Sequence, residues 1–184
     1  MKKSTYIILA VVAIILLYGL VIYNGLVGAS VGIDGQWAQV EAQYQRRLDL
    51  IPNLVASVQG IFKQEQTIFT ALADARAHYA GAANVNQKAA AATEVESALG
   101  RLLVVVENYP QLKSSDTVQT LMSQLEGTEN RISIERKRFN EMVASYNLKT
   151  KRFPSSLVAS LFGFGSRAYF EAAKGAENAP AVKF

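Results

Sequence analysis

Charged residues that could form a site lie near the apolar rows of this 184-residue chain. The residues concerned are Arg46, Arg47, Asp49, Glu107, Glu129, Glu135 and Arg136. If the segments that carry them lie side by side, these residues form a partly buried network of ion pairs and hydrogen bonds. Two roles stay open for this network: it fixes the packing register of the helices, or it forms a polar pocket for a partner's backbone or a lipid headgroup.

The residue types that most enzymes and metal sites need are scarce. The chain has one histidine, His78, and no cysteine, which excludes thiolate metal sites and thiol nucleophiles. It contains no HExxH sequence, glycine-rich phosphate loop or nucleophile elbow. Glu94 and Glu96 are two positions apart and therefore do not share a helical face, which argues against an acid–base pair. We predict no catalytic residue, no metal and no cofactor, and a protein that is not an enzyme.

The N-terminal segment has the composition of a membrane anchor for the remainder of the chain. No charged residue occurs between Lys3 and Asp34, and residues 6–22 are almost entirely aliphatic or tyrosine. A transmembrane helix needs roughly 20 such residues. We therefore expect a short flank at 1–5, a transmembrane helix at 6–28 that contacts the lipid bilayer, and a linker at 29–34.

A cleaved signal peptide is the alternative, with small residues at 27–29 as its cleavage site. The apolar stretch is longer than the roughly 7–15 residues of a signal core, so we favour a retained anchor. Lys2 and Lys3 precede the span and Asp34 is the first charge after it. By the positive-inside rule, the N-terminus is cytoplasmic and the remainder lies outside.

Beyond Gly35, apolar residues recur at helical spacing. The first row steps by seven or fourteen residues through Trp37, Tyr44, Ile51, Val58, Leu72 and Tyr79. It predicts one long helix over about 35–79, kinked near Pro52, with two abutting helices there as the alternative. A second helix follows Lys88 and ends before Pro110, a third covers about 116–152, and a short apolar helix covers 155–162.

These elements predict an all-α fold. The simplest arrangement is an N-terminal transmembrane helix followed by an antiparallel bundle of three long helices plus a short C-terminal helix. The bundle occupies residues 35–170, and 171–184 is a flexible tail.

The uncharged segment 153–166 has two interpretations. It covers the open end of the bundle, which we favour, or it lies in the membrane interface. The residues that would contact the membrane are Leu157, Leu161, Phe162 and Phe164. The basic end of the third helix is a solvated face or a lipid contact, and nucleic acid is disfavoured for a domain outside the cytoplasm.

Several ordered motifs resemble the LemA family of bacterial membrane proteins. The motifs are 46-RRLDLIPNLV-55, 107-ENYPQLK-113, 128-TENRI-132, Phe139-Asn140, Tyr146-Asn147 and Phe153-Pro154. The resemblance implies a single-pass membrane protein with a helical bundle and no established reaction, working with membrane-bound metalloproteases or other envelope proteins. The residues that the resemblance marks as characteristic are Arg46, Arg47, Asp49, Pro52, Asn53, Glu107, Tyr109, Pro110, Glu129, Asn130, Arg131, Asn140 and Asn147; Arg136 joins them through the network above.

From this we expect a non-enzymatic scaffold of the bacterial inner membrane. It would act through protein–protein contacts, as a homo-oligomer or with an envelope membrane protein as partner. The alternative is an accessory module that presents peptide or lipid to a membrane-bound enzyme such as a metalloprotease.

Overall fold

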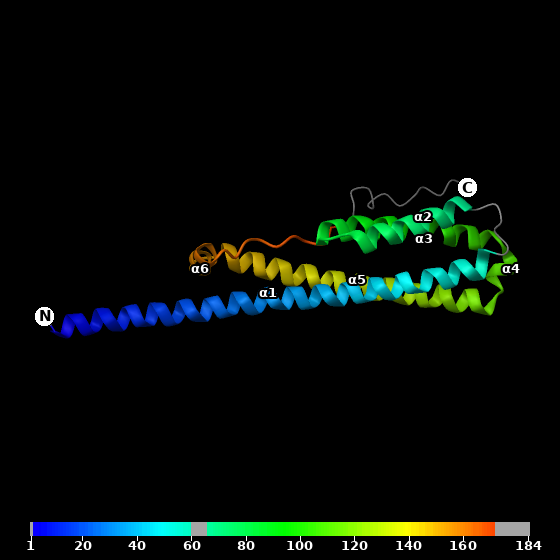
Figure 1. Ribbon diagram of the computed structural model, residues 1–184. Helices are drawn as coiled ribbons and strands as arrows, with labels where there is room; N and C mark the ends of the chain where they lie inside the picture. The colour runs from blue at the N-terminus through cyan, green and yellow to red at the C-terminus, as the bar shows by residue number, and fades with distance from the viewer. Residues whose placement is uncertain (1, 60–65, 172–184) are drawn as a thin grey trace. The chain divides into compact units, whose positions relative to one another are not determined.

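The structure, a computed structural model, describes residues 2–59 and 66–171. Its elements are α1 (Lys2–Gln59), α2 (Gln66–Gly81), α3 (Val85–Asn108), α4 (Pro110–Lys113), α5 (Asp116–Lys151) and α6 (Ser155–Phe162) (Figure 1). These two ranges contain no strand, so the prediction of an all-helical chain is confirmed for them. Contacts divide the chain into a first unit, Met1–Ala38 with Arg138–Ala168, and a second unit, Gln39–Lys137 with Tyr169–Phe184.

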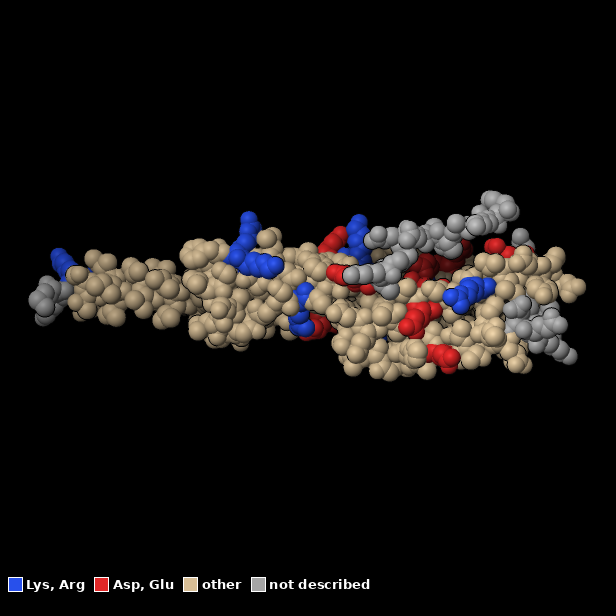
Figure 2. All heavy atoms as spheres, turned by 90° about the horizontal axis from the view of Figure 1, so that it is seen from above, with Lys and Arg blue, Asp and Glu red and all other residues tan. Residues whose placement is uncertain are grey.

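The first unit begins with an exposed apolar helix. By length and composition, α1 is the one helix in the described ranges that is able to cross a membrane. Its large apolar side chains from Tyr6 to Val21 are all exposed, and the face seen in Figure 2 shows no charged side chain between the lysine at its start and the level of α6. Leu26 is its first buried residue. Residues 29–34, predicted as a linker, are part of the same helix.

The remainder of the first unit packs α5 and α6 against α1. Phe139, Val143 and Tyr146 of α5 are buried, and the ring centroids of Trp37 and Phe139 are 5.3 Å apart. At Gly32, a Cβ atom would lie 3.0 Å from Cε of Met142, so the missing side chain lets the two helices approach. Because a left-handed residue at the C-terminus favours glycine, Gly163, with φ of 74°, ends α6.

Four helices surround the core of the second unit: the C-terminal part of α1, α2, α3 and the N-terminal part of α5. The apolar rows predicted from the sequence supply this core, with Tyr44, Ile51, Leu72, Leu99 and Leu125 among its buried members. Contacts of α1 with α3 progress from Glu41–Lys88 to Tyr44–Glu96, so these helices run in the same direction. Along α1 the neighbours on α5 progress from Glu129 back to Thr117, so α5 is antiparallel to α1.

The prediction of one long helix over 35–79 is wrong. The ring centroids of Tyr44 and Tyr79 are 5.2 Å apart, whereas 35 residues of continuous helix would separate them by about 52 Å. α1 and α2 are therefore separate helices, and residues 60–65 between them lie outside the described residues. Pro52 lies inside α1, so the helix does continue through the proline. The predicted tail lies outside the described residues from 172 onward.

The later predicted helices are present, but α3 begins at Val85, three residues before Lys88, after which it is predicted. Asn84 caps α3, its side-chain oxygen accepting a hydrogen bond of 2.9 Å from the backbone N–H of Gln87. The helix ends at Asn108, before Pro110, and the single turn α4 at 110–113 was not predicted. The third predicted helix corresponds to α5 and the short apolar one to α6.

Candidate functional site

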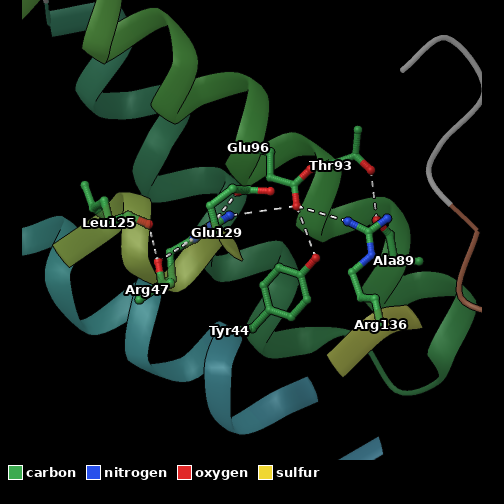
Figure 3. Close-up of polar contacts among 9 residues, drawn as sticks. Tyr44, Arg47, Ala89, Thr93, Glu96, Leu125, Glu129 and Arg136 are labelled. Atoms are coloured by element: carbon green, nitrogen blue, oxygen red, sulfur yellow. Dashed lines mark hydrogen bonds and ion pairs between the residues drawn. The ribbon is translucent and has the colours of Figure 1, made fainter. Parts of the chain in front are cut away.

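A buried arginine is the centre of the polar network in the second unit (Figure 3). Arg47 is 2% exposed. Its Nε donates a hydrogen bond of 3.1 Å to Oγ1 of Thr128, and one terminal nitrogen forms a close ion pair with Glu129. The other terminal nitrogen lies 3.8 Å from Oε1 of Glu96. Buried charge needs this kind of compensation, because desolvation of an unpaired guanidinium is costly.

Glu96 connects three helices through one oxygen. The hydroxyl of Tyr44 donates to Oε1 of Glu96 over 3.1 Å, and Arg136 lies 3.5 Å from the same atom. Burial and the negative charge of Glu129 raise the pKa of Glu96, and the charges of Arg136 and Arg47 and the Tyr44 hydroxyl oppose this. Burial, followed by the charge of Glu96, raises the pKa of Tyr44, so its hydroxyl stays protonated and able to donate.

The network is balanced in charge and has an aromatic ring against one of its guanidinium groups. Two guanidinium groups, Arg47 and Arg136, face two carboxylates, Glu96 and Glu129. The guanidinium of Arg136 also lies 4.3 Å from the ring centroid of Phe170, a cation–π contact. With every member held by a partner, the arrangement is suited to fixing side chains in place.

A pocket opens beside the network. Its volume is about 350 Å³. The charged residues that line it are Arg47, Glu96, Glu107, Glu126 and Glu129, and the apolar ones include Leu99, Leu103, Met122 and Leu125. Four carboxylates against one guanidinium make this lining acidic. It favours a cationic or apolar ligand over an anionic lipid headgroup.

Three residues predicted for the network, Arg47, Glu129 and Arg136, do come together. Arg46, Asp49, Pro52 and Asn53 are instead on the exposed side of α1. Asp49 accepts a hydrogen bond of 2.8 Å from the side chain of Gln45. Glu107 lines the pocket without joining the ion pairs given above. The remaining predicted positions of the second unit, Tyr109, Pro110, Asn130 and Arg131, are exposed, while Glu135 and Arg136 are half-buried.

Asn147 serves a separate contact, in the first unit. Its Nδ2 donates to the backbone oxygen of Arg167 over 2.9 Å, and its Oδ1 accepts from the N–H of the same residue over 2.8 Å. The two bonds attach the segment after α6 to α5. Asn140, also on α5, is half-buried.

The residues predicted as a membrane contact are mostly exposed. Leu157, Leu161 and Phe162 are exposed and Phe164 is half-buried. The favoured interpretation, that segment 153–166 covers the open end of the bundle, stays a prediction.

Sequence reasoning missed Glu96, Tyr44 and Thr128 as members of the network. Glu94 and Glu96 have different partners, as their two-residue spacing predicts, because Glu94 pairs with His78 over 2.8 Å. The overlooked signal is spacing: Glu96 follows Ala92 by four residues and precedes Leu99 by three, which places it on the apolar face of α3.

His78 is exposed and pairs with Glu94 on the surface of the second unit. Its hydrogen bond with Glu94 and the charge of Glu94 raise the pKa of His78. Desolvation opposes this rise, and the charge of Asp74 adds a smaller contribution to it. In residues 2–59 and 66–171, no group of three metal-ligating side chains is found.

Comparisons with known proteins give a family and three relatives. The LemA family profile matches residues 36–184. The magnetosome protein MamQ of Magnetospirillum gryphiswaldense is 39% identical over 74 residues, which are 40% of this chain and 27% of the relative. The magnetosome proteins MamQ 1 and MamQ 2 of Paramagnetospirillum magneticum are each 28% identical over 175 residues, covering 81% of this chain and 64% of the relative. The chain thus spans less than two thirds of the length of these relatives.

Proposed function

This chain belongs to the LemA family, and we propose that it is a non-enzymatic single-pass protein of the bacterial inner membrane. It acts through protein–protein contacts as a scaffold and works as a homo-oligomer. The relatives are named magnetosome proteins.

The change along α1 from exposed to buried apolar side chains supports this proposal. Its large side chains from Tyr6 to Val21 are exposed and apolar, whereas Val40, Tyr44 and Ile51 of the same helix are buried. An exposed apolar helix of this length has no stable environment in water but an ordinary one in a bilayer. The continuous helix would therefore join a membrane anchor to a packed domain.

The domain is better suited to contacts than to catalysis. The charged groups of its network are paired with one another, as Arg47 is with Glu96 and Glu129. A catalytic group would instead need a reactive atom free to meet a substrate. Such a domain offers its helical surfaces to a partner.

Photo-crosslinking in cells tests the scaffold proposal. A photoreactive residue is placed at Gln59 or Gln119, which are exposed. Ladders that contain only this chain would support self-assembly, and one discrete foreign membrane protein would replace the scaffold with an adaptor. If the purified chain in nanodiscs is monomeric across a hundredfold range of concentration, the oligomer is refuted.

The orientation has its own test. With Lys2 and Lys3 before the span, we propose a cytoplasmic N-terminus. Because the chain has no cysteine, Ser4→Cys and Ser114→Cys can each be labelled alone with an impermeant reagent. Labelling of Ser114→Cys in intact spheroplasts supports this orientation, and labelling only after lysis reverses it.

The pocket beside Arg47 favours one form of the alternative function. Its four carboxylates would accept a basic peptide segment in an accessory module that presents peptide to a membrane-bound enzyme such as a metalloprotease. Substituting Glu107→Gln and Glu126→Gln should weaken crosslinking of such a peptide while leaving the melting temperature unchanged. Equal crosslinking of the peptide to the unsubstituted chain and to the substituted chain would refute this alternative.

A further inference from the structure

The short helix α6 presents an apolar surface that its own unit does not cover. Phe153, Leu157, Leu161 and Phe162, which we call the α6 face, are 82, 63, 79 and 58% exposed. The buried residue of α6 is Ala159, so the helix packs through a small side chain. Single exposed leucines are ordinary on protein surfaces, but four large apolar side chains within ten residues mark a contact surface.

The place where α6 meets α1 indicates what covers this face. The ring of Tyr23 lies 4.8 Å from that of Phe162 and 5.6 Å from that of Phe164, centroid to centroid. Figure 1 shows α6 beside α1, beyond the exposed N-terminal part of that helix. Tyr23 follows Lys3 by 20 residues, which is about 30 Å of helix and matches the hydrocarbon core of a bilayer.

This length places the contact at a membrane surface. When Lys3 lies at one surface of the bilayer, Tyr23 lies at the other, where tyrosine side chains are enriched. The rings of Phe162 and Phe164 then hold α6 at the depth where acyl chains meet headgroups. Lipid surrounds any exposed side chain at that depth.

The charges next to the α6 face fit an anionic headgroup layer. Lys149, Lys151 and Arg152 come directly before it, and all three are exposed. Arg167 comes after it and is bound to Ser30 over 2.8 Å and to Asp34 over 3.1 Å. Ser30 and Asp34 are about 10 to 16 Å beyond Tyr23 along α1, at headgroup depth or just outside it.

We propose that the α6 face enters the interface of the same bilayer that α1 crosses, with the neighbouring basic residues among anionic headgroups. The first unit thus contacts one membrane at two places, a spanning helix and an interfacial helix. Two contacts restrict rotation and tilt of α1, which a single span leaves free. This inference rests on the proposed insertion of α1.

Depth-dependent fluorescence quenching tests the inference on the full chain. Three single-cysteine variants carry an environment-sensitive fluorophore in nanodiscs of phosphatidylcholine with phosphatidylserine: Leu161→Cys on the α6 face, Leu16→Cys in the span, and Ser123→Cys as an exposed control in the second unit. Spin labels are placed on the lipid either near the headgroup or deep in the acyl chain. We expect at least twofold quenching of Leu161→Cys by the shallow label and less by the deep one. Leu16→Cys should show the reverse, and Ser123→Cys should show neither.

The controls separate failure of this inference from failure of the anchor. If Leu161→Cys matches Ser123→Cys while Leu16→Cys is quenched by the deep label, the interfacial contact is refuted and the anchor stands. If Leu16→Cys is not quenched, the membrane span itself is refuted. Blue-shifted emission of Leu161→Cys without lipid quenching would mean that protein, such as a second copy, covers the face, and would also overturn the inference. Omitting phosphatidylserine should reduce the shallow quenching, and unchanged quenching would refute the role given to the basic residues.

Discussion

Replacing Arg47 with methionine should destabilise the second unit, because the substitution removes a paired guanidinium. Methionine leaves little empty volume, so the measured loss reports the pairing rather than a cavity. The side chain of Arg47 is 3% exposed, and methionine retains the apolar stem that packs there. The hydrogen bond to Thr128, of 3.1 Å, is lost, which costs about 1 kcal/mol. Thr128 itself keeps a partner, since its hydroxyl donates to the backbone oxygen of Leu125 over 2.6 Å.

The rest of the loss in unfolding free energy depends on the two carboxylates that lose their partner, Glu96 and Glu129. Breaking a fully buried ion pair costs about 3–5 kcal/mol. The side chain of Glu129 is 56% exposed and regains water, so its part is discounted to about 1 kcal/mol or less. Glu96 is 30% exposed and keeps Arg136 as a partner at 3.5 Å. We therefore expect a loss of about 2–3 kcal/mol in the free energy of unfolding.

Circular dichroism of the full chain in nanodiscs measures this loss. For a chain of this length, 1 kcal/mol corresponds to about 2–4 °C in melting temperature, so Arg47→Met should melt about 4–12 °C lower than the unsubstituted chain. Arg46→Met is the matched control, because it removes the same charge from an exposed neighbour. It should change the free energy by less than about 0.5 kcal/mol.

Two results would contradict the packing role of the network, one in stability and one in binding. If Arg47→Met melts at or above the temperature of Arg46→Met, desolvation of the guanidinium outweighs its pairing, and the network does not stabilise the fold. If Arg47→Met also loses its crosslinked partners while its stability is normal, the network serves binding rather than packing.

Three further predictions concern single groups. Because burial raises the pKa of Glu96, its contribution to stability is present below the ordinary pKa of 4.5 and is lost as pH rises through the raised value; urea titrations across pH should show this loss, and Glu96→Gln should abolish it. Asn147→Ala removes two hydrogen bonds to Arg167, which should cost about 1–3 kcal/mol and speed tryptic cleavage after Arg167, with an unchanged rate arguing against the attachment. His78, the only histidine, should titrate by NMR with a midpoint above its ordinary 6.5, and Glu94→Gln should return the midpoint towards that value; its contribution to folding is present below pH 6.5 and is lost as pH rises through the raised pKa.

Helix boundaries marked by local chemistry were predictable, and one marked by tertiary packing was not. Pro110 delimits the end of α3, as the sequence indicates, whereas its start at Val85 lies three residues before Lys88, after which the helix is predicted. The separation of α1 from α2 was missed because the seven-residue phase carries from Val58 to Leu72 across it. Both helices face the same core, so their apolar rows look like one. Gly60, a residue type common just beyond helix ends, is the signal that the sequence does offer.

Half of the polar network was predictable for a similar reason. Arg47, Glu129 and Arg136 are charged residues on or beside apolar rows, which is unusual enough to single them out. Glu96 occupies an equivalent position on α3, but its membership depends on the direction of α3 relative to α1. The sequence does not encode that direction locally. Once α2 is a separate helix, α3 runs parallel to α1 and Glu96 reaches Tyr44 and Arg47.

The register between α1 and α5 in the second unit is underdetermined by apolar residues alone. The α5 row repeats every seven residues through Val118, Leu125 and Ile132, all buried, so a slide of one repeat, about 10.5 Å, returns apolar side chains to the same face. The polar residues do not repeat in this way. One slide would bring Arg47 to residues 121 and 122, Leu and Met, where α5 would offer it no carboxylate and only Glu96 of α3 would remain. The opposite slide would bring it to residues 135 and 136, Glu and Arg, where a carboxylate replaces the Thr128 hydroxyl but the guanidinium of Arg136 replaces the carboxylate of Glu129. We infer that the Arg47 contacts with Thr128 and Glu129 select one register among those the apolar rows allow, a role that survives even if their net contribution to stability is small.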